Sequence, residues 1–265
     1  MATVIGSTSR PYNMLSYTEA YARIGAAGYT DVAVFANDGQ IPVRADSTAE
    51  EVAAVRTAAA NAGVKPSMIL GRTRLELAMD AAVDDYKRLI DNAAALGAKW
   101  ILEMGTGDEA HFDTYFELMR QAAPHAQAAG LQITMKPHGG ISLTTENLLA
   151  AYDRVGHPAF AISCDPGNII YYTKGERRPE EDITTVAPKV STVIIKDCVV
   201  KAGTPDVMVT PGDGLVDFPL ILNALDQAGF TGPLYVECVG GVEPEQVDRD
   251  LAFTLGYVRG ILASL

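Results

Sequence analysis

One pattern of hydrophobic and polar positions repeats along the chain. An Ala-rich amphipathic stretch ends near a glycine and a short apolar run follows, as in AAGYTDVAVF from Ala26, NAGVKPSMIL from Asn61, LGAKWILEM from Leu96 and AAGLQITMKP from Ala128. The pattern returns as VGHPAFAISCDP from Val155, APKVSTVIIKD from Ala187 (without the glycine) and QAGFTGPLYVE from Gln227. The glycine is expected just past a helix, where the left-handed backbone favours a residue without Cβ. The apolar runs are too short for helices and are rich in Val, Ile and Phe, so they predict buried parallel strands.

The segments between these runs have helical spacing, as shown by Ala53, Val55 and Ala59 in the second of them. Together with TVIGSTS near Thr3, the chain has eight predicted strands that alternate with helices. This alternation indicates an α/β protein with a parallel sheet, and eight units in this length predict a (β/α)8 TIM barrel. An open doubly wound sheet is the alternative, but no GxGxxG follows the first run. No Pro/Gly/Ser-rich linker divides the chain, so we expect a single domain over residues 1–265.

Composition narrows the classes of function. The 265 residues carry a formal net charge of −12, which argues against binding to a nucleic acid. No apolar run approaches the ~20 residues that span a bilayer, and the start of the chain lacks the basic and apolar regions of a secretory signal. The three cysteines are odd in number and far apart, so a reduced, cytoplasmic protein is expected. Self-association is left open.

Polar residues gather where the predicted strands end. These residues are Glu103 on the fourth run, Lys136 and His138 on the fifth, Asp165 and Asn168 on the sixth, Lys196 and Asp197 on the seventh, and Glu237 on the eighth. Active sites of barrel enzymes lie at the carboxyl ends of the strands. We therefore expect most of these side chains to meet at one mouth of the barrel.

Because side chains alternate across a strand, parity predicts which neighbours of these residues face the lumen and which face the helices. Lys136 and His138 share one face. If Glu237 faces the lumen, Cys238 faces the helices, and the same parity puts Cys164 outside the barrel. Both cysteines are therefore expected to be small core hydrophobes.

Some side chains at the mouth are expected to bind substrate, namely Glu103, Asn168, Tyr171 and Asp197. The direction of Glu103 is left open, because it faces either the lumen or a neighbouring helix. Tyr171 either holds substrate hydroxyls or packs in a lid or subunit contact.

Two segments near the mouth are predicted to be a loop and a turn. The charge run KGERRPEED from Lys174 predicts a solvated loop, with phosphate binding by Arg177 or Arg178 as the alternative. In the PGDG segment, Gly212 and Gly214 predict a tight turn over the mouth.

Five motifs give the chain a family resemblance that is clearest over residues 131–241. They are PHGG after the fifth strand, DPGN after the sixth, KD ending the seventh, TPGDGLVDFPLILNAL from Thr210, and VE ending the eighth. With these motifs the sequence resembles the sugar phosphate isomerase/epimerase superfamily, the xylose-isomerase-like TIM barrels. That group includes ketose 3-epimerases, inosose dehydratase and endonuclease IV.

The resemblance implies a metal site that this chain matches only in part. Family members usually bind one divalent ion through a Glu ending strand five, an Asp ending strand six, a His on strand seven and a Glu ending strand eight. Asp165 and Glu237 match two of these ligands, whereas Lys136 and Ile194 occupy the other two positions. We favour Lys136 as a replacement for the metal, because its ammonium would neutralise both carboxylates. The alternative is that His138, Asp165 and Glu237 hold Mn, Mg, Co or Zn with waters.

The resemblance also implies the chemistry, which is removal of a proton next to a carbonyl through an enediolate or enolate. That step needs a base and a positive group at the developing oxyanion. Glu237 or His138 would be the base, and the metal, Lys136 or Lys196 the positive group. A lysine with a lowered pKa could itself act as a base or a Schiff-base nucleophile.

Three functions follow as hypotheses. The first is an isomerase or epimerase that acts on a sugar or keto-sugar, and the second is a lyase of the inosose dehydratase type that acts on a sugar or polyol. The third is a non-catalytic carbohydrate-binding or partner subunit with a degraded metal site. A nuclease is disfavoured, because only four histidines are present and the chain is acidic.

Overall fold

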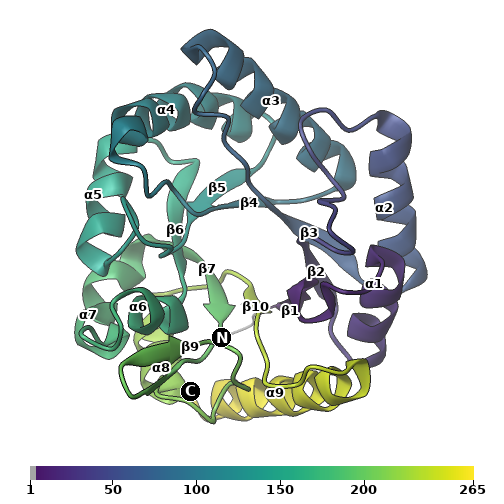
Figure 1. Ribbon diagram of the computed structural model, residues 1–265, viewed down its shortest axis with the longest axis vertical. Helices are drawn as coiled ribbons and strands as arrows, with labels where there is room; N and C mark the ends of the chain where they lie inside the picture. Colours follow the sequence, from purple (N-terminus) through teal and green to yellow (C-terminus); the bar gives the residue numbers. More distant parts are fainter. Residues whose placement is uncertain (1–3) are drawn as a thin grey trace.

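The protein is a closed barrel of parallel strands, seen end-on in Figure 1 of the computed structural model, which describes residues 4–265. Neighbouring strands run in the order β1-β10-β7-β6-β5-β4-β3-β2, and β2 pairs back with β1. The barrel strands are β1 (Ile5–Thr8), β2 (Asp31–Val34), β3 (Lys65–Leu70), β4 (Trp100–Glu103), β5 (Gln132–Met135), β6 (Phe160–Cys164), β7 (Val190–Ile195) and β10 (Leu234–Val236). This confirms the predicted (β/α)8 TIM barrel. The Thr3 end of the first predicted strand lies outside the described residues.

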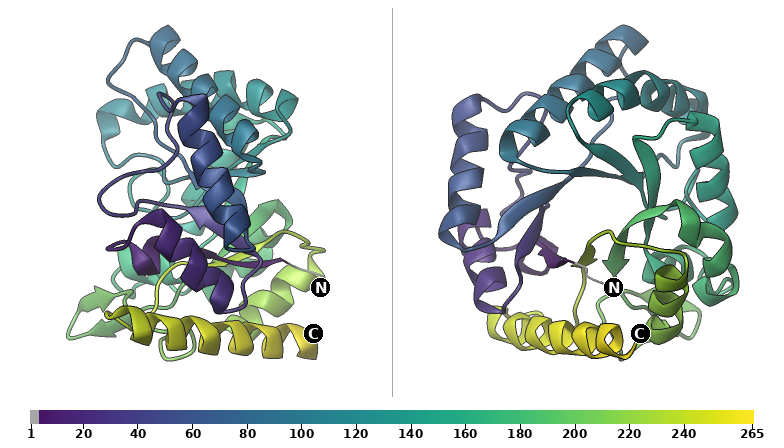
Figure 2. Two further views of the ribbon diagram at one scale, coloured as in Figure 1. Left: turned by 90° about the vertical axis from the view of Figure 1, so that its right-hand side faces the viewer. Right: turned by 180° about the vertical axis from the view of Figure 1, so that it is seen from behind.

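Helices surround the barrel in both end-on views (Figure 1 and Figure 2). They are α1 (Tyr17–Ala26), α2 (Ala49–Asn61), α3 (Met79–Leu96), α4 (Phe112–Ala128), α5 (Thr145–Val155), α6 (Pro166–Tyr172), α7 (Pro179–Val186), α8 (Phe218–Gln227) and α9 (Pro244–Ser264). Gly97 and Gly156 end α3 and α5 with left-handed backbone, as the repeat predicts. Among the described residues, no helix combines the length and apolar character needed to cross a membrane.

Two elements differ from the sequence prediction. The second half of the charge run from Lys174 is not a loop but the start of α7, where Glu180, Glu181 and Asp182 occupy the first turn and favour a helix N-terminus. A hairpin also follows β7, formed by β8 (Val199–Lys201) and β9 (Thr204–Asp206). Its two-residue turn, Ala202 and Gly203, has positive φ at both positions, which is the geometry that tight hairpins favour.

The barrel lumen is filled by side chains of every second residue. An apolar layer comprises Ala33, Phe35, Met68, Leu102, Ile194 and Tyr235. Beside it, hydroxyls form a chain in which Thr192 lies 3.2 Å from Thr134 and donates to Ser163 at 2.9 Å. The next inward-facing positions on these strands are the polar residues of the carboxyl end. The packed side chains of the lumen thus lie directly beneath the polar residues of the mouth.

Candidate active site at the carboxyl end of the barrel

Four buried charged side chains form a closed cluster at the mouth. Lys136, Asp165, Lys196 and Glu237 each follow a barrel strand by one residue, and none exposes more than 4% of its side chain. Lys136 Nζ lies 2.5 Å from Glu237 Oε2 and 3.3 Å from Asp165 Oδ2. Lys196 Nζ lies 2.6 Å from Glu237 Oε1 and 3.1 Å from Asp165 Oδ2. Each ammonium therefore contacts both carboxylates, and the four charges balance.

The cluster shifts the pKa values of Glu237 and Lys196. Burial opposes ionisation of Glu237, but the charges of Lys136 and Lys196 outweigh it and hold the pKa of this carboxyl well below its usual range. Burial likewise opposes charge on Lys196, and here Asp165 and Glu237 outweigh it and raise the pKa of the ammonium. Glu237 is therefore a weak base. Lys196 stays protonated, which argues against its acting as a base or a Schiff-base nucleophile.

Asn168 in α6 orients Lys196. Its side-chain oxygen accepts a hydrogen bond from Lys196 Nζ at 3.1 Å, and its side-chain nitrogen donates to the Pro137 carbonyl at 2.7 Å. Its backbone N–H donates to Asp165 at 3.1 Å. Asn168 also lines the cavity above the cluster, so the substrate contact predicted from the sequence stays available to it.

A cavity of about 260 Å³ opens above the charged cluster. His138 and Tyr171 both line it, as the sequence predicts. The His138 ring lies 4.9 Å, centroid to centroid, from the ring of Tyr172, which in turn packs edge-on against Tyr171 at 5.1 Å. Partial burial, followed by the charges of Lys136 and Lys196, lowers the pKa of His138. This imidazole is therefore neutral at physiological pH and can accept a proton.

Asp197 lies beside the cluster but is not free to bind a substrate. Its carboxylate accepts hydrogen bonds from the backbone N–H groups of Cys198, Gly212, Gly214 and Val216, at 2.8 to 3.1 Å. A Cβ on Gly214 would lie 2.2 Å from Asp197 Oδ1, so only glycine permits this approach. Asp197 thus holds the predicted turn in place, and its role is structural.

Glu103 points away from the mouth. It follows Leu102, which faces the lumen, and its carboxylate lies against the helices, where it accepts a hydrogen bond from Tyr86 of α3 at 2.7 Å. A Cβ on Gly71 would lie 2.1 Å from Glu103 Oε1, so that glycine makes room for the carboxylate. The sequence left open whether Glu103 faces the lumen or a helix, and in the structure its side chain faces the helices. Contrary to the sequence prediction, Glu103 therefore does not face the cavity where a substrate would bind.

Burial of Glu103 gives a testable pH dependence. Burial raises its pKa from the ordinary 4.5 to about 7, against the lowering effect of the Tyr86 hydrogen bond. The folded protein keeps this proton where the unfolded chain loses it, so stability falls as pH rises from about 4.5 to 7, by roughly 2–3 kcal/mol. We expect Glu103→Gln to lack that loss. Urea denaturation of both proteins between pH 4.5 and 8 measures the difference. If the free energy of unfolding depended on pH equally in both proteins, the raised pKa of Glu103 would be contradicted.

Several cavity residues were missed by sequence reasoning, namely Arg10, Phe35, Leu70, Met104 and Val207. Phe35 and Leu70 are the last residues of their apolar runs. The expectation that strand ends form the active site would have found them if it had been applied to apolar as well as polar side chains. Val207 follows the unpredicted hairpin. Arg10 lies in a short 3-10 turn (Arg10–Tyr12) after β1, where no periodic pattern marks it.

The two cysteines of the strand ends are both buried. Cys164 packs in the core between barrel and helices, as parity predicts. Cys238 instead contacts the guanidinium of Arg10 at the rim of the mouth. The arginines of the charge run lie elsewhere, since Arg178 pairs with Glu180 at 3.2 Å and Arg177 lies 3.6 Å from Glu146.

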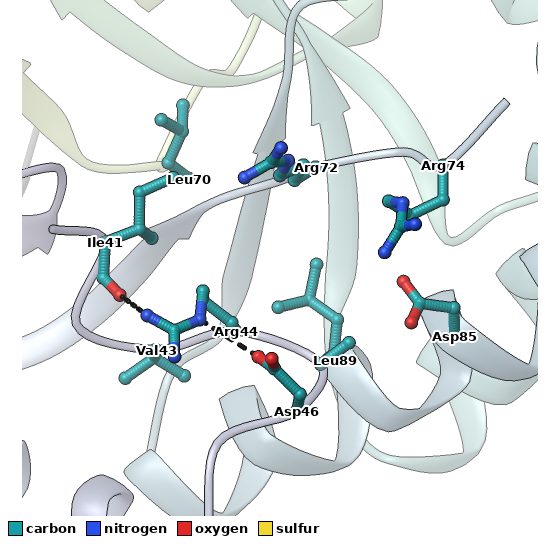
Figure 3. Close-up of a pocket in the computed structure, with 10 residues that line it drawn as sticks. Ile41, Val43, Arg44, Asp46, Leu70, Arg72, Arg74, Asp85 and Leu89 are labelled. Carbon is teal, nitrogen blue, oxygen red and sulfur yellow. Dashed lines mark hydrogen bonds and ion pairs between the residues drawn. The ribbon is translucent and has the colours of Figure 1, made fainter. Parts of the chain in front are cut away.

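A second cavity of about 220 Å³ lies next to the mouth, between the segments that follow β2 and β3 (Figure 3). Leu70 lines both cavities. Within the second, Arg44 pairs with Asp46 at 2.9 Å and donates to the Ile41 carbonyl, while Arg72 projects from the segment that follows β3. Its exposed, partly paired arginines contrast with the buried cluster of the mouth.

The residues of the mouth do not fit a divalent ion. Two of the four implied ligand positions carry an aliphatic side chain, Ile194, and an ammonium, that of Lys136. The two remaining carboxylates are already neutralised by lysines at 2.5 to 3.3 Å. Across residues 4–265, no three His, Cys, Asp or Glu side chains are grouped as an ion would require. His138, Asp165 and Glu237 are thus not brought together as a ligand set.

An eight-stranded parallel barrel with a polar site at its carboxyl mouth defines this molecule as a TIM-barrel protein. A family profile described as xylose isomerase-like TIM barrel matches residues 21–255, and the chain belongs to this family. The family resemblance predicted from the sequence is thereby confirmed.

Solved structures share this fold at low identity. A xylose isomerase domain protein from Planctomyces limnophilus is 21% identical, with a TM-score of 0.74 over 97% of this chain and 96% of that one. A xylose isomerase-like TIM barrel protein from Mycobacterium smegmatis, solved with magnesium, is 18% identical, with a TM-score of 0.77 over 98% of each chain. D-Psicose 3-epimerase from Clostridium cellulolyticum H10, solved with D-tagatose, is 14% identical, with a TM-score of 0.78 over 98% and 99%. No curated protein matched the sequence.

Proposed function

We propose that this protein is a sugar or keto-sugar isomerase or epimerase that moves a proton next to a carbonyl without a bound metal. The observation that carries this proposal is the charged cluster beneath a cavity lined by a neutral imidazole. The family supports it, since it includes ketose 3-epimerases. The lysines take the place that the family gives to a cation.

The mechanism assigns each side chain one task. The neutral ring of His138 takes the proton from the carbon next to the carbonyl, and the electron pair moves onto the carbonyl oxygen to give an enediolate. Lys136 and Lys196, which line the cavity, stabilise that oxyanion as ammonium groups. Return of this proton by His138 to the neighbouring carbon gives the isomer. Its return to the carbon of origin after the enediolate has rotated, so that the opposite face meets His138, gives the epimer. Glu237 and Asp165 hold the lysines in place.

Exchange of carbon-bound hydrogen with solvent tests this mechanism before the substrate is known. The protein would be incubated in D₂O with a chelator and a panel of ketopentoses, ketohexoses and their acids, and deuterium incorporation followed by NMR. We expect exchange next to the carbonyl of at least one compound. We expect it to fall by ~100-fold or more in His138→Asn, because a general base contributes about 10²–10⁴. The rate should rise with pH through a pKa below the usual histidine value.

His111→Asn is the matched control, because His111 lies in the short turn before α4, outside the residues that line the mouth cavity. It should leave exchange unchanged. Exchange by no compound would overturn the catalytic proposal in favour of a binding role. Exchange that chelation abolishes and a metal restores would overturn the metal-free mechanism.

A further inference from the structure

Arg10 brings a third cation to the cavity. It lies two residues past β1, where its backbone N–H donates to Thr8 Oγ1 at 3.3 Å. Its half-buried guanidinium lines the same cavity as Lys136, Lys196 and His138. The arginine thus faces the proposed reaction site from the β1 side of the mouth.

The guanidinium of Arg10 has only sulfur partners within the part of the chain that the structure describes. It contacts Cys238 Sγ and lies 4.0 Å from Met208 Sδ, and no carboxylate lies within ion-pair distance. Burial raises the pKa of the Cys238 thiol to about 11, so this partner is neutral. Several other arginines of this acidic protein pair with carboxylates, as Arg23 does with Asp248 at 2.7 Å. An arginine that is half-buried without an anion lacks the partner that its five donors favour.

The side chains around the cavity carry one more positive charge than negative charges. Arg10, Lys136 and Lys196 face only the carboxylates of Asp165 and Glu237, which the two lysines already neutralise. A ligand that carries one negative charge would balance the site, whereas a phosphate ester, with nearly two charges, would exceed it. A carboxylate also matches the planar, two-pronged geometry of a guanidinium.

The size of the cavity sets a limit on the ligand. About 260 Å³ lies just below the ~300–1,000 Å³ typical of ligand pockets, so a compound of sugar size fits better than a conjugate. The apolar side chains of Phe35, Leu70 and Met104 also line the cavity.

We propose that Arg10 binds the carboxylate of a small sugar acid, so that the substrate has a carboxylate at one end and its reacting carbonyl near the lysines. This assignment of substrate class rests on the proposed function for its catalytic part. The binding part stands by itself, because it needs no turnover.

Calorimetric titration with matched pairs tests the binding. The pairs are D-glucuronate with D-glucose, D-galacturonate with D-galactose, and D-fructose 6-phosphate with D-fructose. We expect a uronate to bind at least ~30-fold more tightly than its neutral partner, since a charge-assisted pair contributes that much. Arg10→Met should erase this preference while affinity for the neutral sugar changes less than twofold. Arg10→Lys should keep part of it, which also guards against a Met variant that fails to fold.

Arg72→Met is the matched control, because it removes an exposed arginine from the neighbouring cavity only. It should leave uronate binding unchanged. Equal affinity for uronates and neutral sugars would overturn the proposal, and so would a loss in Arg72→Met as large as in Arg10→Met. Tightest binding of the phosphate ester, lost in Arg10→Met, would overturn the carboxylate assignment. Because these titrations measure binding alone, an absence of deuterium exchange would refute the proposed function without changing their result.

Discussion

Lys136→Met is expected to lower the free energy of unfolding by about 3–5 kcal/mol, as removal of one partner from a buried ion cluster does. Two buried carboxylates would then share the single ammonium of Lys196. In the native protein the pKa of Glu237 is held low, so its contribution to stability is present above the unfolded value of 4.5 and is lost as pH falls below it. The difference between variant and parent should therefore be large at pH 7, decrease only slightly at pH 4 and shrink further at pH 3. Guanidinium denaturation at these three pH values measures it.

Two further variants separate this effect from a general loss of charge. Lys99→Met removes an exposed lysine and should change stability by less than ~0.5 kcal/mol. Adding Glu237→Gln to Lys136→Met leaves one lysine with one carboxylate, so part of the lost stability should return. Unaltered stability of Lys136→Met at pH 7 would show that Lys136 does not neutralise the carboxylates.

Lys136→Glu combined with Ile194→His is expected to convert the mouth into a metal site. The pair restores the two ligand types that the family resemblance implies, beside Asp165 and Glu237. Three carboxylates would then face one ammonium, a charge balance that favours a divalent cation. We expect one Mn²⁺ or Co²⁺ per chain by plasma mass spectrometry. We also expect a gain of about 2.7 kcal/mol in stability at 100 times the dissociation constant.

The parent and the two single variants are the controls for this conversion. Each lacks at least one of the four ligands, so each should show a weaker thermal shift with added metal than the double variant. A parent protein that retains one tightly bound ion per chain would contradict the reading of Lys136 as the replacement for a metal.

The barrel was predictable because its signal is repeated. Seven helix-to-strand units show the same order of amphipathic stretch and apolar run, six of them with the glycine between, so seven weak signals support one another. The hairpin β8–β9 has no such support, because each of its strands is three residues long. The first turn of α7 was obscured by its own charges, which suit a helix start as well as a solvated loop.

The candidate site was predictable only where strand parity was known. Lys136, Asp165, Lys196 and Glu237 follow their strands by one residue and face inward, and the sequence motifs mark all four. Glu103 is different, because its direction depends on register: it pairs with Met135, one residue before the inward-facing Lys136. Register is set by contacts between strands that the sequence does not encode locally.

The pair of strands that closes the barrel also constrains how the chain folds during synthesis. β1 and β10 pair in parallel, and the matched residues Ser7 and Val236 are 229 positions apart. A ribosome therefore releases β1 long before the strand that must insert between it and β7. Until then both strands present open edges, which can pair with other chains. We therefore expect nascent chains that end before Val236 to be more prone to aggregation than the complete barrel.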